Sequence, residues 1–293
     1  MTYKLITMKR ILTTVLGLLL SGIPAIMMAA AEMPDWQNPQ VVQRNRLPMA
    51  TTFDAGGLNL TLNGMWKFNW NESVDVRPLD FYGLGYDDAG WDEIPVPGMW
   101  ELNGYGDPIY LNIGYAWRGH YDNNPPYPAL EHNYVGQYRK TFVLDENWDG
   151  KDVFLHIGSA TSNVRVWVNG KEVGYSEDSK LEARFDITKY VRKGENLIAL
   201  EIFRWCDGTY LEDQDFFRFS GIARDVYVYS REKKRLENVK VVASASGDAA
   251  LYAEVSKGVT AVSFDILDPS GKQVASTRVD VNAKNRSENG LPY

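Results

Sequence analysis

The segment Arg204–Val226 carries residue types that could recognise a sugar. Its 23 residues hold five acidic side chains, three arginines and five aromatic rings. Carboxylates accept hydrogen bonds from sugar hydroxyls, and aromatic rings stack on the C–H faces of sugars. The alternative is an ion network within a loop, which the composition alone favours. The choice between the two depends on the rest of the chain.

The elements expected on either side of this segment are short β-strands. Apolar and polar residues alternate with period two between Gly, Asn, Asp and Pro, and amphipathic helical periodicity is nearly absent. The dipeptide Asn169-Gly170 predicts a two-residue hairpin turn. Many short strands without intervening helices predict an all-β fold, an antiparallel sandwich or jelly roll. Strands are expected at 63–70, 137–144, 152–157, 163–168, 196–203 and 224–230.

A second β domain is expected after the basic run Arg231–Arg235. Four further strands are predicted at 239–245, 249–255, 259–267 and 273–281, with a turn at Asp268–Gly271. They are typical of the start of an immunoglobulin-like sandwich, which needs about seven strands and about 100 residues. The expected domains are therefore 1–31, a leader; 32–231, a jelly-roll sugar-binding domain; and 232–293, an incomplete immunoglobulin-like domain.

Residues 1–31 have the pattern of a secretory signal peptide. A basic start at Lys9-Arg10 precedes the apolar run Ile11–Met28, and Ala29–Ala31 is typical of a cleavage site. The alternative is a membrane anchor, since about 20 apolar residues can span a bilayer. The interrupting Pro24 favours cleavage and an exported, periplasmic or extracellular protein.

Charge and cysteine content exclude some functions. Loss of the leader removes three positive charges and takes the formal net charge from −7 to −10. Such a chain is not expected to bind nucleic acid, because neutralising phosphates needs clustered Lys and Arg. The single cysteine, Cys206, allows no disulfide within the chain and is expected to be a packed thiol.

Ordered motifs give the chain a resemblance to a known family. From about residue 35 to about residue 228 it resembles the lac-type β-galactosidases of glycoside hydrolase family 2. Motifs of this length, in the right order, are far more specific than one short pattern. The matching segments are Asp35–Pro39, Asn45–Leu47, Leu62–Phe68, Pro95–Trp100, Gly104–Asn112, Gly174–Ser179 and the opening segment Arg204–Val226.

This resemblance implies that other parts of a longer enzyme do the chemistry. Family members have five domains, and a (β/α)₈ barrel carries the two catalytic glutamates of a retaining glycosidase, about 5–5.5 Å apart. Nothing in this sequence resembles that barrel, so we expect no catalytic residue here and no hydrolysis by this chain alone. The implied partners are a galactoside substrate, the C-terminal barrel and, in the intact enzyme, further copies.

The resemblance also implies two substrate-binding residues. In the family, the jelly roll lends two loops to the galactose pocket of the barrel. The matching side chains are Asn112, whose amide can donate and accept hydrogen bonds, and Asp215, which also ligates Na⁺. The alternatives are a turn-shaping role for Asn112 and a salt bridge from Asp215 to Arg218 or Arg224. Glu212 and Asp213 are expected to be structural.

A Mg²⁺ site is implied between the N-terminal arm and the jelly roll. All of its ligands would offer oxygen, as Mg²⁺ requires. The alternative is an ordinary acidic loop. Position 177 is Glu where the family enzyme we compare has Gln, which adds a negative charge. The matching positions are Asp35, Asn38, the carbonyl of Val41, Glu177 and Asp207.

Other functions remain open at this point. A free-standing carbohydrate-binding module is one alternative, because jelly rolls often serve as lectins. A part of a β-glucuronidase or β-mannosidase is another, although the Glu-Asp-Gln-Asp and Pro-Ile-Tyr-x-Asn motifs fit β-galactosidase better. The long loop Tyr110–Tyr134 is expected to border the pocket, the barrel or a neighbouring subunit.

Overall fold

A computed structural model describes residues 33–49 and 57–281. The leader expected at residues 1–31 lies outside them. Within the described ranges, no helix is long and apolar enough to cross a membrane.

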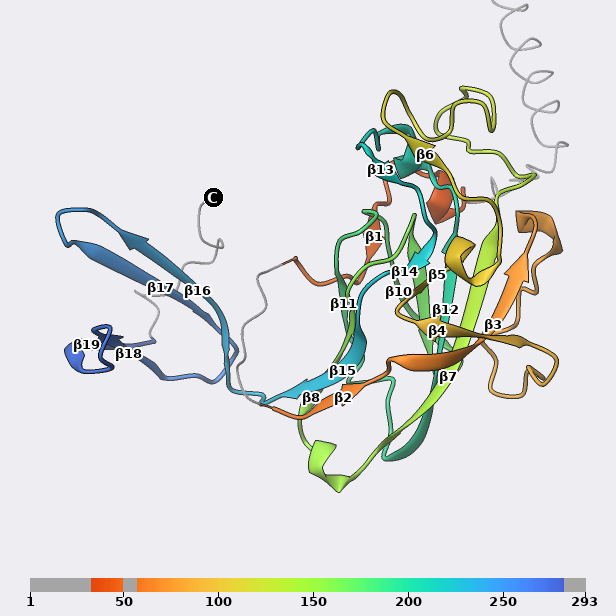
Figure 1. The fold of residues 1–293 in the computed structure, drawn as a ribbon. Coiled ribbons are helices and arrows are strands. Elements are labelled where there is room, and N and C mark those ends of the chain that lie inside the picture. The colour runs from red at the N-terminus through yellow and green to blue at the C-terminus, as the bar shows by residue number, and fades with distance from the viewer. Residues whose placement is uncertain (1–32, 50–56, 282–293) are drawn as a thin grey trace, which may run out of the picture. The chain divides into compact units, whose positions relative to one another are not determined.

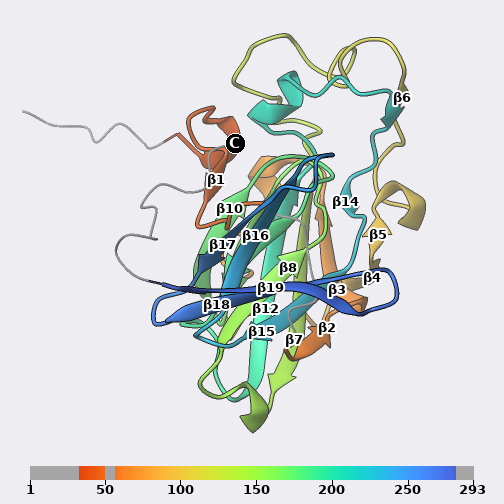
Figure 2. The same ribbon diagram turned by 90° about the vertical axis from the view of Figure 1, so that its left-hand side faces the viewer.

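Two antiparallel sheets form a sandwich, which confirms the expected all-β fold. The four-stranded sheet lies to the left of the seven-stranded sheet in Figure 1 and in front of it in Figure 2. The larger sheet contains, from edge to edge, β1 (Gln43–Arg44), β10 (Lys171–Ser176), β9 (Val164–Val168), β12 (Gly194–Phe203), β7 (Val135–Leu144), β3 (Gly64–Asn71) and β4 (Asp92–Val96). The smaller contains β11 (Ala183–Asp186), β8 (Asp152–Ile157), β15 (Val226–Arg231) and β2 (Asn59–Thr61).

Short elements join and cap these strands. Two two-residue ladders lie beside the sheets: β5 (Gly98–Met99) pairs with β14 (Gly221–Ile222), and β6 (Tyr110–Leu111) pairs with β13 (Phe216–Phe217). The single-turn 3₁₀ helices are η1 (Asp35–Gln37), η2 (Val74–Val76), η3 (Glu101–Asn103), η4 (Glu146–Trp148) and η5 (Asp207–Tyr210).

The core lies between the two sheets and contains large aromatic side chains. Trp66, Trp100 and Tyr138 are almost completely buried, and the Trp100 indole donates a hydrogen bond to the Tyr138 hydroxyl. Gly136 on β7 is required by this packing, because a Cβ atom there would lie 2.3 Å from the Trp100 ring. Each such side chain contributes about 1.5–3 kcal/mol through burial. The core thereby fixes the strands that carry the loops at the end of the sandwich.

The C-terminal residues form two separate hairpins. The first joins β16 (Leu236–Ala243) to β17 (Ala249–Val255), and the second joins β18 (Ala261–Leu267) to β19 (Gln273–Asp280). The predicted turn at Asp268–Gly271 is present, since the Gly271 amide donates to the Asp268 carbonyl at 2.9 Å. An immunoglobulin-like sandwich in this region stays a prediction, as do the domain boundaries.

Most of the expected strands are confirmed. The predicted hairpin turn is also present: Val168 pairs with Lys171, and Asn169 and Gly170 have φ values of 51° and 77°, the positive values that a type I′ turn needs. The short strands β1, β2, β4, β5, β6, β11, β13 and β14 are not anticipated by the alternation pattern.

Candidate functional site

The β6–β13 ladder places Asn112 next to Asp215. Leu111 pairs with Phe216 and Tyr110 with Phe217, so Asn112 and Asp215 are the next opposing positions in this register. Opposing residues of an antiparallel pair have Cα atoms about 4.5–5.5 Å apart. Both side chains are exposed, at one end of the sandwich where β6 and β13 lie in Figure 1. Two residues expected to bind sugar are therefore brought together from distant parts of the chain.

The partner of Asp215 is a tyrosine rather than an arginine. The Tyr110 hydroxyl donates to Asp215 Oδ1 at 3.2 Å, and this hydrogen bond raises the pKa of Tyr110. Within residues 33–49 and 57–281, no Lys or Arg nitrogen lies within 4.0 Å of the Asp215 carboxylate. The salt bridges considered for Asp215 are thus not formed, and its second oxygen stays available to a ligand.

Arg218 supports the segment before Asp215. Its guanidinium donates to the carbonyl of Gln214 and lies over the Phe216 ring, 4.2 Å from the ring centroid. Its backbone amide donates to the carbonyl of Ile109 at 2.8 Å. The two loops that carry the predicted sugar ligands are therefore joined by side-chain and backbone contacts as well as by the ladder.

Glu212 has a structural contact, as the sequence predicts. Its Oε1 accepts a hydrogen bond from the Ser179 amide at 3.2 Å, and burial raises the pKa of this carboxyl. Asp213 is exposed.

The segments that carry Asn112 and Asp215 also expose large apolar side chains. Ile113 and Leu211 are each 84% exposed, and Tyr110 and Phe217, whose rings lie 5.1 Å apart, are 54% and 57% exposed. Single exposed apolar residues are ordinary, but four on two neighbouring segments could be covered by another part of a protein.

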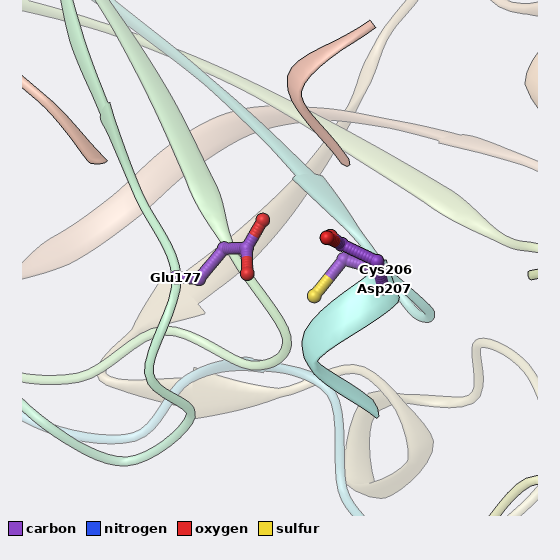
Figure 3. A group of neighbouring side chains, drawn as sticks. All are labelled: Glu177, Cys206 and Asp207. Atoms are coloured by element: carbon purple, nitrogen blue, oxygen red, sulfur yellow. The ribbon is translucent and has the colours of Figure 1, made fainter. Parts of the chain in front are cut away.

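A second site is formed by Glu177, Cys206 and Asp207. Glu177 follows β10 and Asp207 begins η5, and their carboxylates point toward each other and toward the Cys206 thiol (Figure 3). One potential ligand atom from each residue lies within 4.8 Å of the others. The residues Glu177 and Asp207 are each only 7% exposed, and Cys206 is fully buried. The packed thiol was expected, but its place beside two acids was not.

The electrostatics of the Glu177–Asp207 pair favour binding of a proton or a cation. Burial and the neighbouring charge of Asp207 raise the pKa of Glu177 to about 9. Burial also raises the pKa of Asp207. The Tyr175 hydroxyl donates to Glu177 Oε1 at 2.7 Å, whereas the buried Oδ1 of Asp207 has no hydrogen-bond partner among the described residues. Buried like charges and an unpartnered oxygen fit the oxygen-ligand chemistry of Mg²⁺.

The N-terminal arm lies beside this pair. Trp36 packs in one apolar cluster with Tyr175 and Cys206, Val41 packs against that cluster, and the Glu177 amide donates to the carbonyl of Val42 at 3.0 Å. The arm that carries the predicted ligands Asp35, Asn38 and Val41 is thus placed at Glu177 and Asp207.

The Asp35 carboxylate has other partners. Its Oδ1 accepts from Arg44 at 2.8 Å, and its Oδ2 accepts from Arg165 at 2.7 Å. Burial alone would raise the pKa of Asp35, but the two arginines hold it below its usual value. The buried Asp35 carboxylate therefore forms ion pairs with the half-exposed Arg44 and the more buried Arg165, and it is not in the Glu177–Cys206–Asp207 group. The ligand set as a whole stays a prediction.

A family model decides the classification of the sandwich. The model described as "Glycosyl hydrolases family 2, sugar binding domain" matches residues 60–232, from β2 to the end of β15. The chain belongs to glycosyl hydrolase family 2. The match covers the β6–β13 ladder and the Glu177–Asp207 pair, so both sites lie within the family 2 domain.

Curated relatives of this family 2 chain are β-galactosidases. A β-galactosidase from Priestia megaterium is 38% identical over 250 residues, which are 80% of this chain and 24% of that protein. One from Halalkalibacterium halodurans is 45% identical over 170 residues, 58% of this chain and 17% of that protein. A β-galactosidase large subunit from Leuconostoc lactis is 32% identical over 82% of this chain and 42% of its own length. The chain thus spans less than half the length of these relatives.

Solved structures confirm the fold of the family 2 domain. A β-glucuronidase from an uncultured Clostridium species superposes with a TM-score of 0.58 at 19% identity, over 80% of this chain and 40% of that one. A family 2 member from Bacteroides cellulosilyticus gives 0.53 at 22% identity, over 78% of this chain and 29% of that one. At these identities the likeness concerns the arrangement of strands alone.

Proposed function

We propose that this chain is the sugar-binding part of a β-galactosidase that hydrolyses terminal β-D-galactosides with retention. The supporting observation is that Asn112 and Asp215 directly follow and precede the paired residues of the β6–β13 ladder, at an exposed end of a family 2 sugar-binding domain. An amide that donates and accepts, beside a carboxylate that accepts, can bind two adjacent sugar hydroxyls. The β-galactosidase relatives support the sugar, since they match this chain at 32–45% identity.

The chemical step belongs to other residues of the longer enzyme. Retaining hydrolysis needs a nucleophile and an acid/base about 5–5.5 Å apart, and the chain's resemblance implies that a barrel supplies them. The role of this chain is to orient galactose. The exposed Tyr110, Ile113, Leu211 and Phe217 would pack against that barrel.

Two cations are part of the proposal. Na⁺ would be held by the free oxygen of Asp215 together with ligands from the barrel. Mg²⁺ would be held by Glu177 and Asp207, with Asn38 and the Val41 carbonyl from the adjoining arm. It would replace the proton that the buried pair otherwise needs, and it would tie the arm to the sandwich.

Export and assembly are the remaining parts of the proposal. The basic and apolar pattern of residues 1–31 supports secretion across a membrane and cleavage after Ala31. The intact enzyme is proposed to form homo-oligomers.

The test combines this chain with the barrel-containing remainder of the enzyme. The purified chain should give negligible turnover of nitrophenyl-β-galactoside, and the mixture should be active. In that mixture, Asn112→Ala and Asp215→Ala should each lower kcat/KM by about 10- to 1,000-fold, because each removes a hydrogen bond worth about 1.5–3 kcal/mol or more in a buried site. The matched controls Asn123→Ala and Asp213→Ala change exposed neighbours and should retain activity.

Two results would contradict the proposal. Hydrolysis by the chain alone would place catalytic groups within it. Sub-millimolar binding of galactose or lactose by the isolated chain, measured by calorimetry, would instead favour a free-standing carbohydrate-binding module.

A further inference from the structure

The sequence contains Asn-Gly pairs at Asn63, Asn103, Asn169 and Asn289, and the last of these lies outside the described residues. In such a pair the main chain can attack its own side chain, because glycine has no Cβ atom that shields its amide nitrogen. The other three pairs share the same two residues but differ in their surroundings. This difference decides which of them can react in the folded chain.

The Asn169 side chain is fixed by three hydrogen bonds. Its Nδ2 donates to the Tyr190 carbonyl at 2.9 Å and to Asn196 Oδ1 at 2.8 Å, and its Oδ1 accepts from the Leu197 amide at 3.0 Å. Asn169 and Gly170 are both half-buried. An attack on Cγ must turn the amide away from these partners, so the hairpin turn protects this pair.

The Asn63 side chain is restrained at both ends of its amide. Its Nδ2 donates to Asp225 Oδ1 at 2.9 Å, and its Oδ1 accepts from the Val226 amide at 2.9 Å. These two bonds join the turn between β2 and β3 to the start of β15. Asn63 is also half-buried, so this second pair is protected by the packing of the smaller sheet.

Asn103 is the least restrained of the three. Asn103 and Gly104 are both exposed, at the end of the single turn η3. Within the described ranges the Asn103 side chain forms one hydrogen bond, from Nδ2 to the Met99 carbonyl at 2.7 Å, and the Gly104 amide forms no well-aligned one. A Cβ atom at Gly104 would have no described atom within 4 Å apart from its chain neighbours. The attacking nitrogen is therefore unprotected.

We propose that Asn103 is a site of spontaneous deamidation. The deprotonated Gly104 nitrogen attacks Cγ of Asn103, a C–N bond forms, the bond from Cγ to Nδ2 breaks, and the nitrogen leaves as ammonia with the displaced proton. Water then opens the resulting succinimide at either carbonyl and gives aspartate or isoaspartate. Water is the only co-reactant. Opening of a short exposed turn costs little free energy, so the folded chain can reach the reacting geometry.

Both products alter the turn after η3. A carboxylate cannot donate to the Met99 carbonyl, so that hydrogen bond is lost. Isoaspartate also adds a methylene group to the main chain between residues 103 and 104. The Tyr105 amide donates across this link to the carbonyl of Trp100, at 3.0 Å. Isoaspartate therefore lengthens a loop that is closed on a core tryptophan.

The test follows the three described pairs in the full chain. Folded and urea-unfolded samples are incubated at the same mildly alkaline pH, mass spectrometry of peptides detects the replacement of NH₂ by OH, and chromatography separates aspartate from isoaspartate. The unfolded rate corrects for the neighbouring residues. The ratio of folded to unfolded rates should be at least about tenfold higher for Asn103 than for Asn63 or Asn169, because two or three hydrogen bonds must open at those two.

Two variants keep the result decisive. Asp225→Ala removes the acceptor of Asn63 Nδ2 and should raise the folded-state rate at Asn63 at least about threefold, without changing the rate at Asn103. The control Asp122→Ala changes another exposed aspartate and should leave both rates unchanged. Equal rate ratios at the three pairs would overturn the proposal. So would an Asn103 that stays intact in the folded chain while it reacts in urea.

Discussion

The sandwich and the C-terminal hairpins are built from similar strands but differ in what those strands bury. In β8 and β12 nearly every residue is buried or half-buried, whereas all eight residues of β19 are exposed. The hairpins expose apolar side chains such as Val241, Val274 and Leu267, which are 57–61% exposed. An isolated two-stranded hairpin is at best marginally stable in water. The comparison teaches that alternation of apolar residues specifies a strand, while a second sheet is needed to make that strand stable.

Hydrogen exchange should show the largest difference between the two regions. Amides in the middle of β7 and β12 should exchange only through global unfolding. Those of β18 and β19 should exchange through local opening, whose free energy is expected to be close to zero. With a global stability of about 5–15 kcal/mol, exchange rates should differ at least about 1,000-fold. Mass spectrometry of peptides from each region measures this. Equal protection would show that the hairpins are as stable as the sandwich.

A matched pair of substitutions should separate the regions by several kcal/mol. Ile202→Ala removes a fully buried side chain of β12 and should cost about 2–5 kcal/mol. Ile266→Ala changes a side chain that is 41% exposed in β18 and should cost less than about 1 kcal/mol. All nine tryptophans precede residue 232, so their fluorescence during urea unfolding reports on the sandwich, and circular dichroism covers both regions. A loss of stability for Ile266→Ala as large as the loss for Ile202→Ala would contradict the proposed difference between the two regions.

The buried acids of the sandwich should make its stability depend on pH. The pKa of Glu177 is raised from 4.5 to about 9, so the metal-free folded state keeps a proton that the unfolded state releases. Stability is therefore fully present below about pH 4.5 and is lost as the pH rises toward 9. We expect the free energy of unfolding to fall progressively between pH 5 and 9, by up to about 6 kcal/mol, since each unit of pKa shift corresponds to about 1.4 kcal/mol.

Denaturation with and without Mg²⁺ measures this effect. Mg²⁺ should restore stability mainly at high pH, and Glu177→Gln should flatten the metal-free profile. The control Glu195→Gln alters an exposed glutamate of β12 and should leave the profile unchanged. A wild-type profile that does not fall with rising pH would count against a protonated pair.

The smallest effect is expected at the exposed end of the sandwich. Tyr110→Phe removes an exposed hydrogen bond to Asp215 and should leave the free energy of unfolding almost unchanged. The pKa of Tyr110 is raised by Asp215, so Asp215→Asn should lower it toward its usual value. Ultraviolet titration of the tyrosines, with Tyr110→Phe to assign the signal, measures the shift. An unchanged titration would mean that the two side chains do not interact.

The long strands could be predicted from the sequence because their signal is local. Residues 152–157 and 249–255 alternate or run apolar between turn residues, and they match β8 and β17 at both ends. The ladder between β6 and β13 has only two residues on each side, so no periodicity marks it. Its pairing depends on how the whole sandwich folds, which a local pattern does not contain.

The candidate sites were anticipated in part for a similar reason. The motifs identified Asn112 and Asp215 individually, and the β6–β13 register places them at opposing positions. The motifs also identified Asp35, but its ion pairs with Arg44 and Arg165 depend on the arm folding against β9 and β10.

The β6–β13 register has a consequence for the order of folding. Asn112 and Asp215 are 103 positions apart in the sequence, and closing a loop of that length has an entropic cost that only the completed sandwich offsets. During synthesis the pair cannot form until residue 217 has left the ribosome and the strands between have folded. Non-local contacts of this kind are also among the slowest to form. The edge that we propose to bind sugar is therefore a late product of folding, so its binding competence would report that the domain is complete.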